Sequence, residues 1–226
     1  LSAEKRHGNS ILYRNLAHLF DLYKPRTTLG EITSAWLTRF EHYQRAERKM
    51  KPGGIGANMR TLRAVCNRAI KAGIMKQDWY PFSTYPLGHL SQPTPKRAIA
   101  LEDLRRILDA DMGENPQETL ARDLFQFSLY ARGMNLVDIA HLRPGNIHSG
   151  RIEYTRRKTH QPYSVGLNEY TTAILEKYAT PGATYCFPIL SDFFVTQKQQ
   201  QERIHRVMVQ VNRSIRTIAD RLGLPT

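Results

Sequence analysis

The chain has 226 residues, enough for one or two domains that each bury a core of their own. Hydrophobic residues make up 41% of it and charged residues 23%, which is ordinary for a soluble globular protein. No apolar run approaches the roughly 20 residues of a membrane span, and the polar first ten residues lack the apolar segment of a signal peptide. We therefore expect a cytoplasmic protein with no membrane partner.

The charge is strongly positive. Thirty-three Lys and Arg against 20 Asp and Glu give a net charge of +13, with a pI near 10.0. Residues 1–92 carry +9 of this excess and residues 93–226 carry +4. A basic fold of this size most often binds a polyanion, and nucleic acid is the first candidate. The alternative is a solvated basic surface without a partner.

Cysteines and histidines exclude several kinds of site. The 2 cysteines, Cys66 and Cys186, lie far apart, and no CxxC pair is present. The 8 histidines are scattered, with no pair at metal-ligand spacing beside a third partner. The sequence therefore predicts neither a disulfide scaffold nor a metal site. A glycine-rich phosphate loop and a GxSxG elbow are also missing, so no cofactor is expected.

The first part of the chain predicts a small helical bundle. Apolar residues at helical spacing indicate one helix from about Ser10, a candidate N-cap, and a second after Thr33. A third helix follows Pro52 and ends near Gly73.

A proline-rich stretch separates this bundle from the rest of the chain. Residues 79–97 read WYPFSTYPLGHLSQPTPKR. Because prolines disfavour helix and keep the backbone extended, we interpret this stretch as an interdomain linker. The predicted domains are residues 1–92 and residues 93–226.

The second domain is predicted to be helical with one β-hairpin. Residues 101–111 look helical, and a longer helix is announced by Asn115 as N-cap, with Glu118 completing a capping-box pattern. It ends at Gly133, and Asn135 then caps a short helix. Alternating residues on either side of a turn at His160-Gln161-Pro162 predict the hairpin, and helices follow from Asn168 and over about 198–222. The fold class is therefore mainly α with a small β-hairpin or sheet.

The third predicted helix has a polar stripe opposite its apolar one. Arg60, Arg63, Asn67 and Lys71 follow one another at steps of three, four and four. Arg and Asn are residue types that read guanine and adenine edges in the major groove of DNA. The alternative is the solvated face of an ordinary amphipathic helix.

The predicted hairpin carries a cluster of cations near its turn. Arg156 and Lys158 are two residues apart, so a regular strand would put both on one face. Arg can hold two phosphate oxygens, and Lys is a compact charge that can also donate a proton. The alternative is an edge strand on which Arg156, Arg157 and Lys158 prevent edge pairing.

The order of these features resembles the tyrosine site-specific recombinases of the phage-integrase family. YARGMNLVDIAHLRPGNI followed by RIEYTRRKTHQPYSVGL is similar to the first half of their catalytic domain. Residues 1–92, with LRAVCNRAIKAGI and YPF, are similar to their helical, SAM-like core-binding domain. KRAIALEDLRRIL is similar to the start of the catalytic domain. The similarity is closest to the branch found on mobile elements of Bacteroides-type bacteria.

This resemblance implies a fold and an activity. The fold would be a core-binding domain followed by part of a DNA breaking-rejoining domain. The activity would be integration, excision or transposition of a mobile element, in which a tyrosine attacks the scissile phosphate and forms a phosphotyrosyl link. The partners would be double-stranded DNA and further copies of the protein, assembled as a tetrameric synapse. The family's chemistry needs no metal and no cofactor.

The resemblance also assigns residues. Lys158 falls on the family's hairpin lysine, and Asp138 on a structural acidic position. The position of the first catalytic arginine, however, holds Asn135, so another arginine must supply that charge. We favour Arg156, on its strand face with Lys158, over Arg132 at the end of the preceding helix. The residues expected to contact DNA are Arg60, Arg63, Asn67, Lys71, Lys96, Arg97 and Arg157.

The family's His-x-x-Arg segment and its nucleophilic tyrosine have no counterpart in the 226 residues. We therefore expect a C-terminally truncated recombinase that binds DNA without cleaving it. One alternative is a non-catalytic DNA-binding accessory protein at recombination sites. A generic RNA-binding protein is less favoured, because no aromatic sheet platform is visible.

Overall fold

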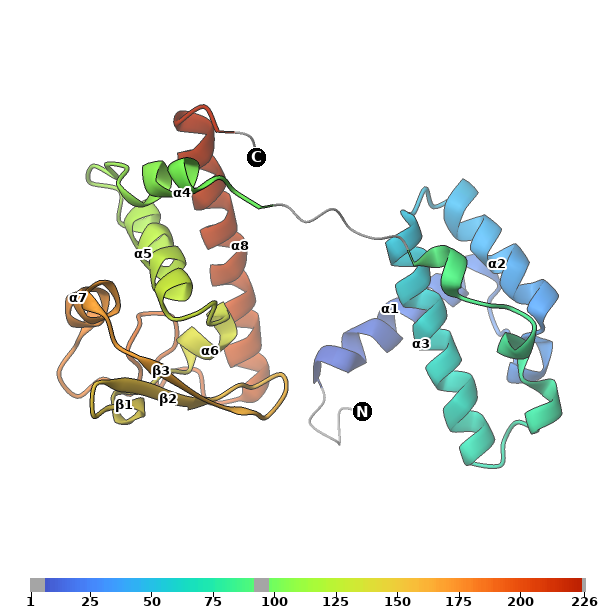
Figure 1. Ribbon diagram of the computed structural model, residues 1–226. Helices are drawn as coiled ribbons and strands as arrows, with labels where there is room; N and C mark the ends of the chain where they lie inside the picture. The colour runs from blue at the N-terminus through green and yellow to red at the C-terminus, as the bar shows by residue number, and fades with distance from the viewer. Residues whose placement is uncertain (1–6, 92–97, 225–226) are drawn as a thin grey trace. The chain divides into compact units, whose positions relative to one another are not determined.

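The computed structural model describes residues 7–91 and 98–224. The chain divides into two compact units, Leu1–Lys96 and Arg97–Thr226 (Figure 1). Helices predominate, and the second unit holds a three-stranded antiparallel sheet. The expected fold class is thus confirmed. Within the described ranges, no helix combines the length and apolar character needed to cross a membrane.

The first unit is built from α-helices and short 3-10 turns. The α-helices are α1 (His7–Tyr23), α2 (Ser34–Ala46) and α3 (Pro52–Lys71). The 3-10 turns are η1 (Leu29–Glu31), η2 (Gln77–Trp79), η3 (Pro81–Ser83) and η4 (Gly88–Leu90).

Local signals explain where most of these helices begin and end. Helix α2 follows Thr33 as predicted, and the Thr33 hydroxyl caps it by accepting a 3.2 Å hydrogen bond from the backbone N–H of Trp36. Gly73 has a φ of +72°, the left-handed conformation that ends α3. The prediction for α1 is wrong, because the helix already starts at His7 and Ser10 lies inside it.

Aromatic rings and the buried side of α3 form the core of this unit. The rings of Phe20, Trp36 and Phe40 pack with centroids 4.8 to 5.2 Å apart. The polar side chain of Gln44 is also fully buried. Its Oε1 accepts a 2.8 Å hydrogen bond from Asn58 Nδ2, which satisfies the buried amide.

The prediction of a linker over residues 79–97 is wrong for its first part. Residues up to 91 form the turns η2, η3 and η4, and Phe82, Tyr85 and Leu90 are buried in the core of the first unit. Prolines exclude an α-helix here, but they permit 3-10 turns that fold back and insert the apolar side chains between them. The rest of the predicted linker, residues 92–97, lies outside the described residues.

The second unit packs helices around a small sheet. Its helices are α4 (Leu101–Leu108), α5 (Pro116–Tyr130), α6 (Leu136–Ala140), α7 (Glu169–Tyr178) and α8 (Gln197–Arg221), with the 3-10 turn η5 (Pro144–Asn146). Its strands are β1 (Ile147–His148), β2 (Arg151–Thr155) and β3 (Pro162–Gly166). Helix α8 runs beside α5, and the sheet lies at the end of the unit away from α4 (Figure 1).

The predicted cap at Asn115 and the predicted helix start at Asn168 are confirmed. The side chain of Asn115 accepts hydrogen bonds from the N–H groups of Gln117 and Glu118, and that of Asn168 accepts one from Thr171. The predicted capping box at α5 is not completed, because the Glu118 carboxylate instead lies 2.9 Å from Arg221 Nη1. This ion pair joins the start of α5 to the end of α8.

The predicted hairpin is confirmed, with a different turn. Strand β2 pairs with β3 so that Ile152 faces Val165 across the ladder, and both side chains are buried. Pro162, which we expected in the turn, is the first residue of β3. An edge strand tolerates proline there because it needs no N–H on its open side.

Candidate nucleic-acid interface

The polar stripe on α3 has the geometry that the sequence predicts. Arg60, Arg63, Asn67 and Lys71 are all exposed, while the apolar stripe of α3 is buried against the core. The Arg60 guanidinium lies close to Gly56, where a Cβ would stand 3.1 Å from Arg60 Nη1. Helix α3 therefore presents a row of cations and one amide to solvent, and the major groove of DNA is wide enough to admit an α-helix.

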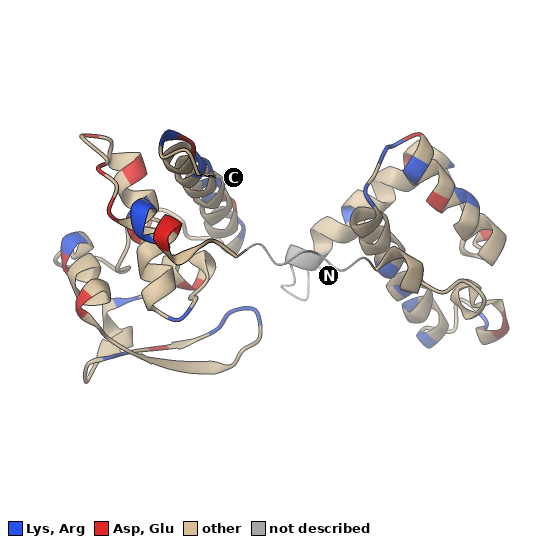
Figure 2. Ribbon diagram, turned by 45° about the horizontal axis from the view of Figure 1, so that its top comes forward, with Lys and Arg blue, Asp and Glu red and all other residues tan. Residues whose placement is uncertain are grey.

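The loop before α3 adds cations that the sequence reasoning missed. Arg48, Lys49 and Lys51 are exposed between α2 and α3. Lys49 has a φ of +50°, so its backbone adopts the left-handed conformation that few non-glycine residues take. Three cations within four residues were a visible signal in the sequence. Figure 2 shows the basic positions of this unit in blue.

The hairpin loop carries Lys158 at its tip. The N–H of Arg156 donates to the carbonyl of Gln161, and the N–H of His160 donates to the carbonyl of Arg156, both at 2.8 Å. His160 has a φ of +57°, which turns the chain back into β3. Arg157 and Lys158 are exposed in this loop, which is largely blue in Figure 2.

The shared strand face of Arg156 and Lys158 is a wrong prediction. Strand β2 ends at Thr155, and the loop bond between Arg156 and Gln161 closes the hairpin before the alternation reaches Lys158. The period-two geometry that favoured Arg156 over Arg132 therefore does not apply to this loop. Both arginines remain hypotheses for the missing charge.

Asp138 links the short helix α6 to the hairpin loop. Its side chain is buried, and Oδ1 accepts a 3.0 Å hydrogen bond from the backbone N–H of Arg157. Burial, with the charge of Asp138, raises the pKa of the Tyr154 hydroxyl on β2. Burial also lowers the pKa of the His141 imidazole, and the nearby Arg157 adds to this effect. Charged groups of helix α6 and of the hairpin therefore lie close enough to shift one another's pKa values.

Arg132 occupies a strained backbone position. It is exposed and has a φ of +57°, directly before Gly133 with a φ of +77°. The N–H of Gly133 donates to the carbonyl of Ser128 at 2.8 Å and closes the end of α5. An arginine in the left-handed region costs about 1–2 kcal/mol relative to an ordinary conformation.

Asn135 lies at the N-cap position of α6, as expected, but its side chain makes no capping hydrogen bond. The predicted capping role of the Asn135 side chain is therefore wrong. Lys96 and Arg97 lie outside the described residues. Among the described residues, no hydrogen bond or ion pair joins the side chains of Arg132, Arg156 and Lys158 to one another.

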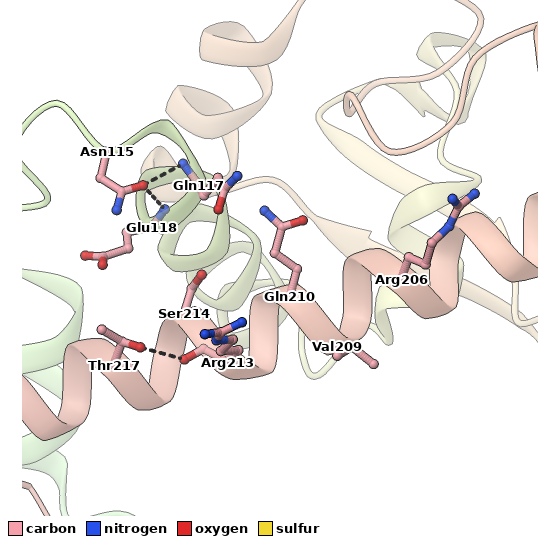
Figure 3. Close-up of a pocket in the computed structure, with 9 residues that line it drawn as sticks. All are labelled: Asn115, Gln117, Glu118, Arg206, Val209, Gln210, Arg213, Ser214 and Thr217. Carbon is pink, nitrogen blue, oxygen red and sulfur yellow. Dashed lines mark hydrogen bonds between the residues drawn. The ribbon is translucent and has the colours of Figure 1, made fainter.

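A hollow of about 440 Å³ lies between the start of α5 and α8 (Figure 3). Arg206 and Arg213 reach it from α8, and Glu118 borders it from α5. The Asn115 side chain already accepts the N–H groups of Gln117 and Glu118 at the helix start. The N–H groups at the start of α5 that could bind an anion are thus already bonded to Asn115, and the Glu118 carboxylate borders the hollow. Both features disfavour an anion site there.

The described residues support neither a metal site nor a cysteine nucleophile. No group of three or more His, Cys, Asp or Glu residues there could hold a metal ion. Cys66 and Cys186 are both buried and unpaired, and burial raises the pKa of each thiol to about 11. Neither thiol is therefore available as a thiolate nucleophile at neutral pH.

Comparison with known proteins places this geometry in context. Residues 1–85 match the family described as the phage integrase SAM-like domain. No curated protein sequence matches the chain. A crystal structure of a lambda integrase tetramer bound to a Holliday junction is similar, with a TM-score of 0.62 and 13% identity. That similarity covers 90% of this chain and 59% of the other. The fold is that of the integrases.

Two more integrase structures share this fold. Lambda integrase residues 75–356 bound to DNA give a TM-score of 0.65 at 12% identity, over 96% of this chain and 71% of that one. The Tn1549 transposon integrase in complex with a circular intermediate DNA gives 0.56 at 15% identity, over 87% and 67%. The chain spans less than two thirds of the length of the lambda integrase in the tetramer.

Proposed function

We propose that this chain is the DNA-binding part of a tyrosine recombinase that integrates or excises a mobile genetic element. The observation that carries the proposal is the exposed row of Arg60, Arg63, Asn67 and Lys71 along α3 of an integrase fold. A helix with such a row can enter the major groove, where arginine reads guanine and asparagine reads adenine. The net charge of +9 on residues 1–92 supplies the non-specific attraction to phosphates.

The hairpin loop serves the scissile phosphate in this proposal. Lys158, at the exposed tip of the loop, protonates the leaving 5′ oxygen, and Arg156 or Arg132 stabilises the charge that builds on the phosphate. Asp138 supports this role, because its bond to the Arg157 N–H holds the loop against α6. Arg157 contacts the DNA backbone beside the site. Further copies of the protein assemble on the DNA, as the resemblance implies.

The nucleophile of the reaction is not assigned to a tyrosine of residues 1–226. Burial raises the pKa of Tyr85 and of Tyr178, and both hydroxyls donate to carboxylates, those of Glu41 and Asp123. These two hydroxyls are therefore poor sources of a phenolate. We infer that residues 1–226 bind DNA but form no covalent link with it, whether they belong to a recombinase or to a non-catalytic accessory protein.

A charge-reversal experiment tests the DNA-binding role of α3. The variant Arg63→Glu/Lys71→Glu changes the α3 row, and Arg14→Glu/Arg39→Glu makes the same charge change on α1 and α2. Duplex affinity is measured by fluorescence anisotropy at one salt concentration. We expect the α3 variant to bind at least about tenfold more weakly than the control variant, because each lost direct contact costs about 1–3 kcal/mol. Equal losses in the two variants would remove the assigned interface.

A nicked suicide substrate tests the second inference. The 226-residue protein is incubated with it and run on a denaturing gel, where we expect no protein–DNA band. A covalent band would show that a tyrosine within residues 1–226 is the nucleophile, and the sequence assignment would then be wrong.

A further inference from the structure

Two large apolar side chains stand exposed on the loop that follows α3. Ile74 is 72% exposed and Trp79 is 58% exposed. Tryptophan is on average among the highly buried residues of folded proteins. The other tryptophan, Trp36, follows that rule and is 2% exposed. The loop therefore presents an aromatic ring that the core of the first unit does not cover.

The rest of the loop holds this ring in a fixed place. The N–H groups of Ile74 and Met75 both donate to the carbonyl of Ala69, at 2.9 and 3.2 Å. Met75 is buried in the core, and so is Phe82 after the turn. The N–H of Trp79 donates to the carbonyl of Lys76 at 3.1 Å. Anchors on both sides thus keep Trp79 outside the core and limit the entropy lost on binding.

One cation is in contact with the exposed ring. Lys76 Nζ lies 5.4 Å from the centroid of the Trp79 ring, within range of a cation–π contact. Lys71, the last residue of α3, is exposed at the end of the row that we assign to DNA. An exposed aromatic ring with a lysine on a flexible stem at its face is complementary to a nucleotide, because the base can displace the ammonium and stack on the ring while the ammonium meets the phosphate.

We propose that Trp79 stacks on an unpaired base of the bound DNA, with Lys76 and Lys71 neutralising the neighbouring phosphates. In an intact duplex, both faces of every base are covered by its neighbours. The indole ring can therefore reach an unpaired base only at a bulge, a gap or a single-stranded overhang. The inference rests on the proposed function and deepens it, because it names the DNA feature that this loop recognises. Stacking on any base is favourable, so the loop selects structure rather than sequence.

The intrinsic fluorescence of the protein can test this contact directly. Because Trp36 is buried, quenching by acrylamide in the absence of DNA reports on Trp79. The probes are a duplex with a one-nucleotide bulge and a fully paired duplex with the same ends. We expect the bulged duplex to quench the emission and to protect it from acrylamide, and the paired duplex to do neither.

Variants separate the ring from the rest of the loop. Trp79→Leu keeps an apolar side chain without an aromatic face, and Ile74→Ala removes the other exposed apolar group as a matched control. Anisotropy is measured with both duplexes, after circular dichroism has verified folding. We expect Trp79→Leu to weaken binding of the bulged duplex about tenfold. Its binding of the paired duplex, and both affinities of Ile74→Ala, should stay within about twofold of the original protein.

Several results would overturn the inference. A Trp79 that acrylamide cannot reach without DNA is covered by another part of the protein or by a second copy. An equal loss for both duplexes on Trp79→Leu assigns the ring to ordinary duplex contact. Binding of the paired duplex with no preference for the bulge removes the stacking and leaves the proposed function intact. Failure to bind either duplex overturns both.

Discussion

Asp138 Oδ1 accepts a 3.0 Å hydrogen bond from the backbone N–H of Arg157. The two residues lie 19 positions apart, and the carboxylate is only 6% exposed. This bond fastens the loop that carries Lys158 to the short helix α6. The position of the lysine therefore depends on a side chain that is itself too buried to contact DNA.

Replacing this carboxylate should loosen the hairpin loop. Asp138→Ala leaves the Arg157 N–H without its acceptor, and we expect it to lower the free energy of unfolding by about 1–3 kcal/mol. Asp138→Asn keeps an acceptor oxygen at the same place and should cost less. Urea denaturation gives the stability, and hydrogen exchange at the Arg157 amide reports on the loop. Equal stability and equal amide protection in the two variants would mean that the bond does not hold the loop.

The backbone strain at Arg132 gives a prediction of opposite sign. Arg132→Gly should raise the free energy of unfolding by about 0.5–1 kcal/mol, because glycine adopts a positive φ without steric cost. Arg132→Ala keeps the strain and serves as the control, with no gain expected. Thermal denaturation of the three proteins measures the difference. If alanine stabilises as much as glycine, the arginine side chain and not its backbone is the source of the cost.

The choice between Arg132 and Arg156 requires a recombinase that contains these residues and cleaves DNA. Loss of the cation at the scissile phosphate should reduce the cleavage rate by roughly 10²–10³. We expect this loss for one of the two variants Arg156→Ala and Arg132→Ala, and near-normal cleavage for the other. Asn135→Ala should leave cleavage and stability nearly unchanged, because the Asn135 side chain makes no capping bond. Near-normal rates in both arginine variants would exclude both residues from the role.

The stability of the first unit should depend on pH through Glu41. Burial alone would raise the pKa of its carboxyl, but hydrogen bonds from Tyr85, Arg45 and His89 together lower it from 4.5 to about 2. The folded state therefore binds this proton less readily than the unfolded chain. The stabilisation is fully present above about pH 5 and is lost as the pH falls toward 2, by up to about 3 kcal/mol.

Glu41→Gln isolates this contribution, because it removes the titrating group and leaves the other carboxylates unchanged. We expect the stability difference between the original protein and the variant to shrink steadily from pH 5 to pH 2. Chemical denaturation at several pH values measures it. A difference that stays constant over this range would contradict the lowered pKa.

Local signals in the sequence predict much of this fold. The cap at Asn115 and the helix starts at Thr33 and Asn168 depend on residues within one helical turn, and the structure confirms them. The alternation that predicts the hairpin is equally local. The position of the hairpin turn does not follow from this alternation. The hydrogen bond between Arg156 and Gln161 closes the loop and ends strand β2, although the alternating pattern continues beyond it.

The errors come from contacts that are distant along the chain. The prolines in residues 79–91 suggest an extended linker. The side chains of Phe82 and Tyr85 are nevertheless buried in the core formed by helices that precede them in the chain. The bond from Asp138 to the hairpin loop has no signal in the spacing of either segment. The exposure of Trp79 is equally invisible, since the same residue type forms the core at Trp36.

The salt dependence of duplex binding tests the central claim most directly. If about six phosphates are neutralised, the logarithm of the association constant should fall with the logarithm of salt concentration at a slope near −5. Anisotropy titrations of the 226-residue protein from low to moderate salt give this slope, and Arg63→Glu/Lys71→Glu should make it shallower. A flat dependence, or no binding at low salt, would contradict the assignment of this chain as a DNA-binding part of a recombinase.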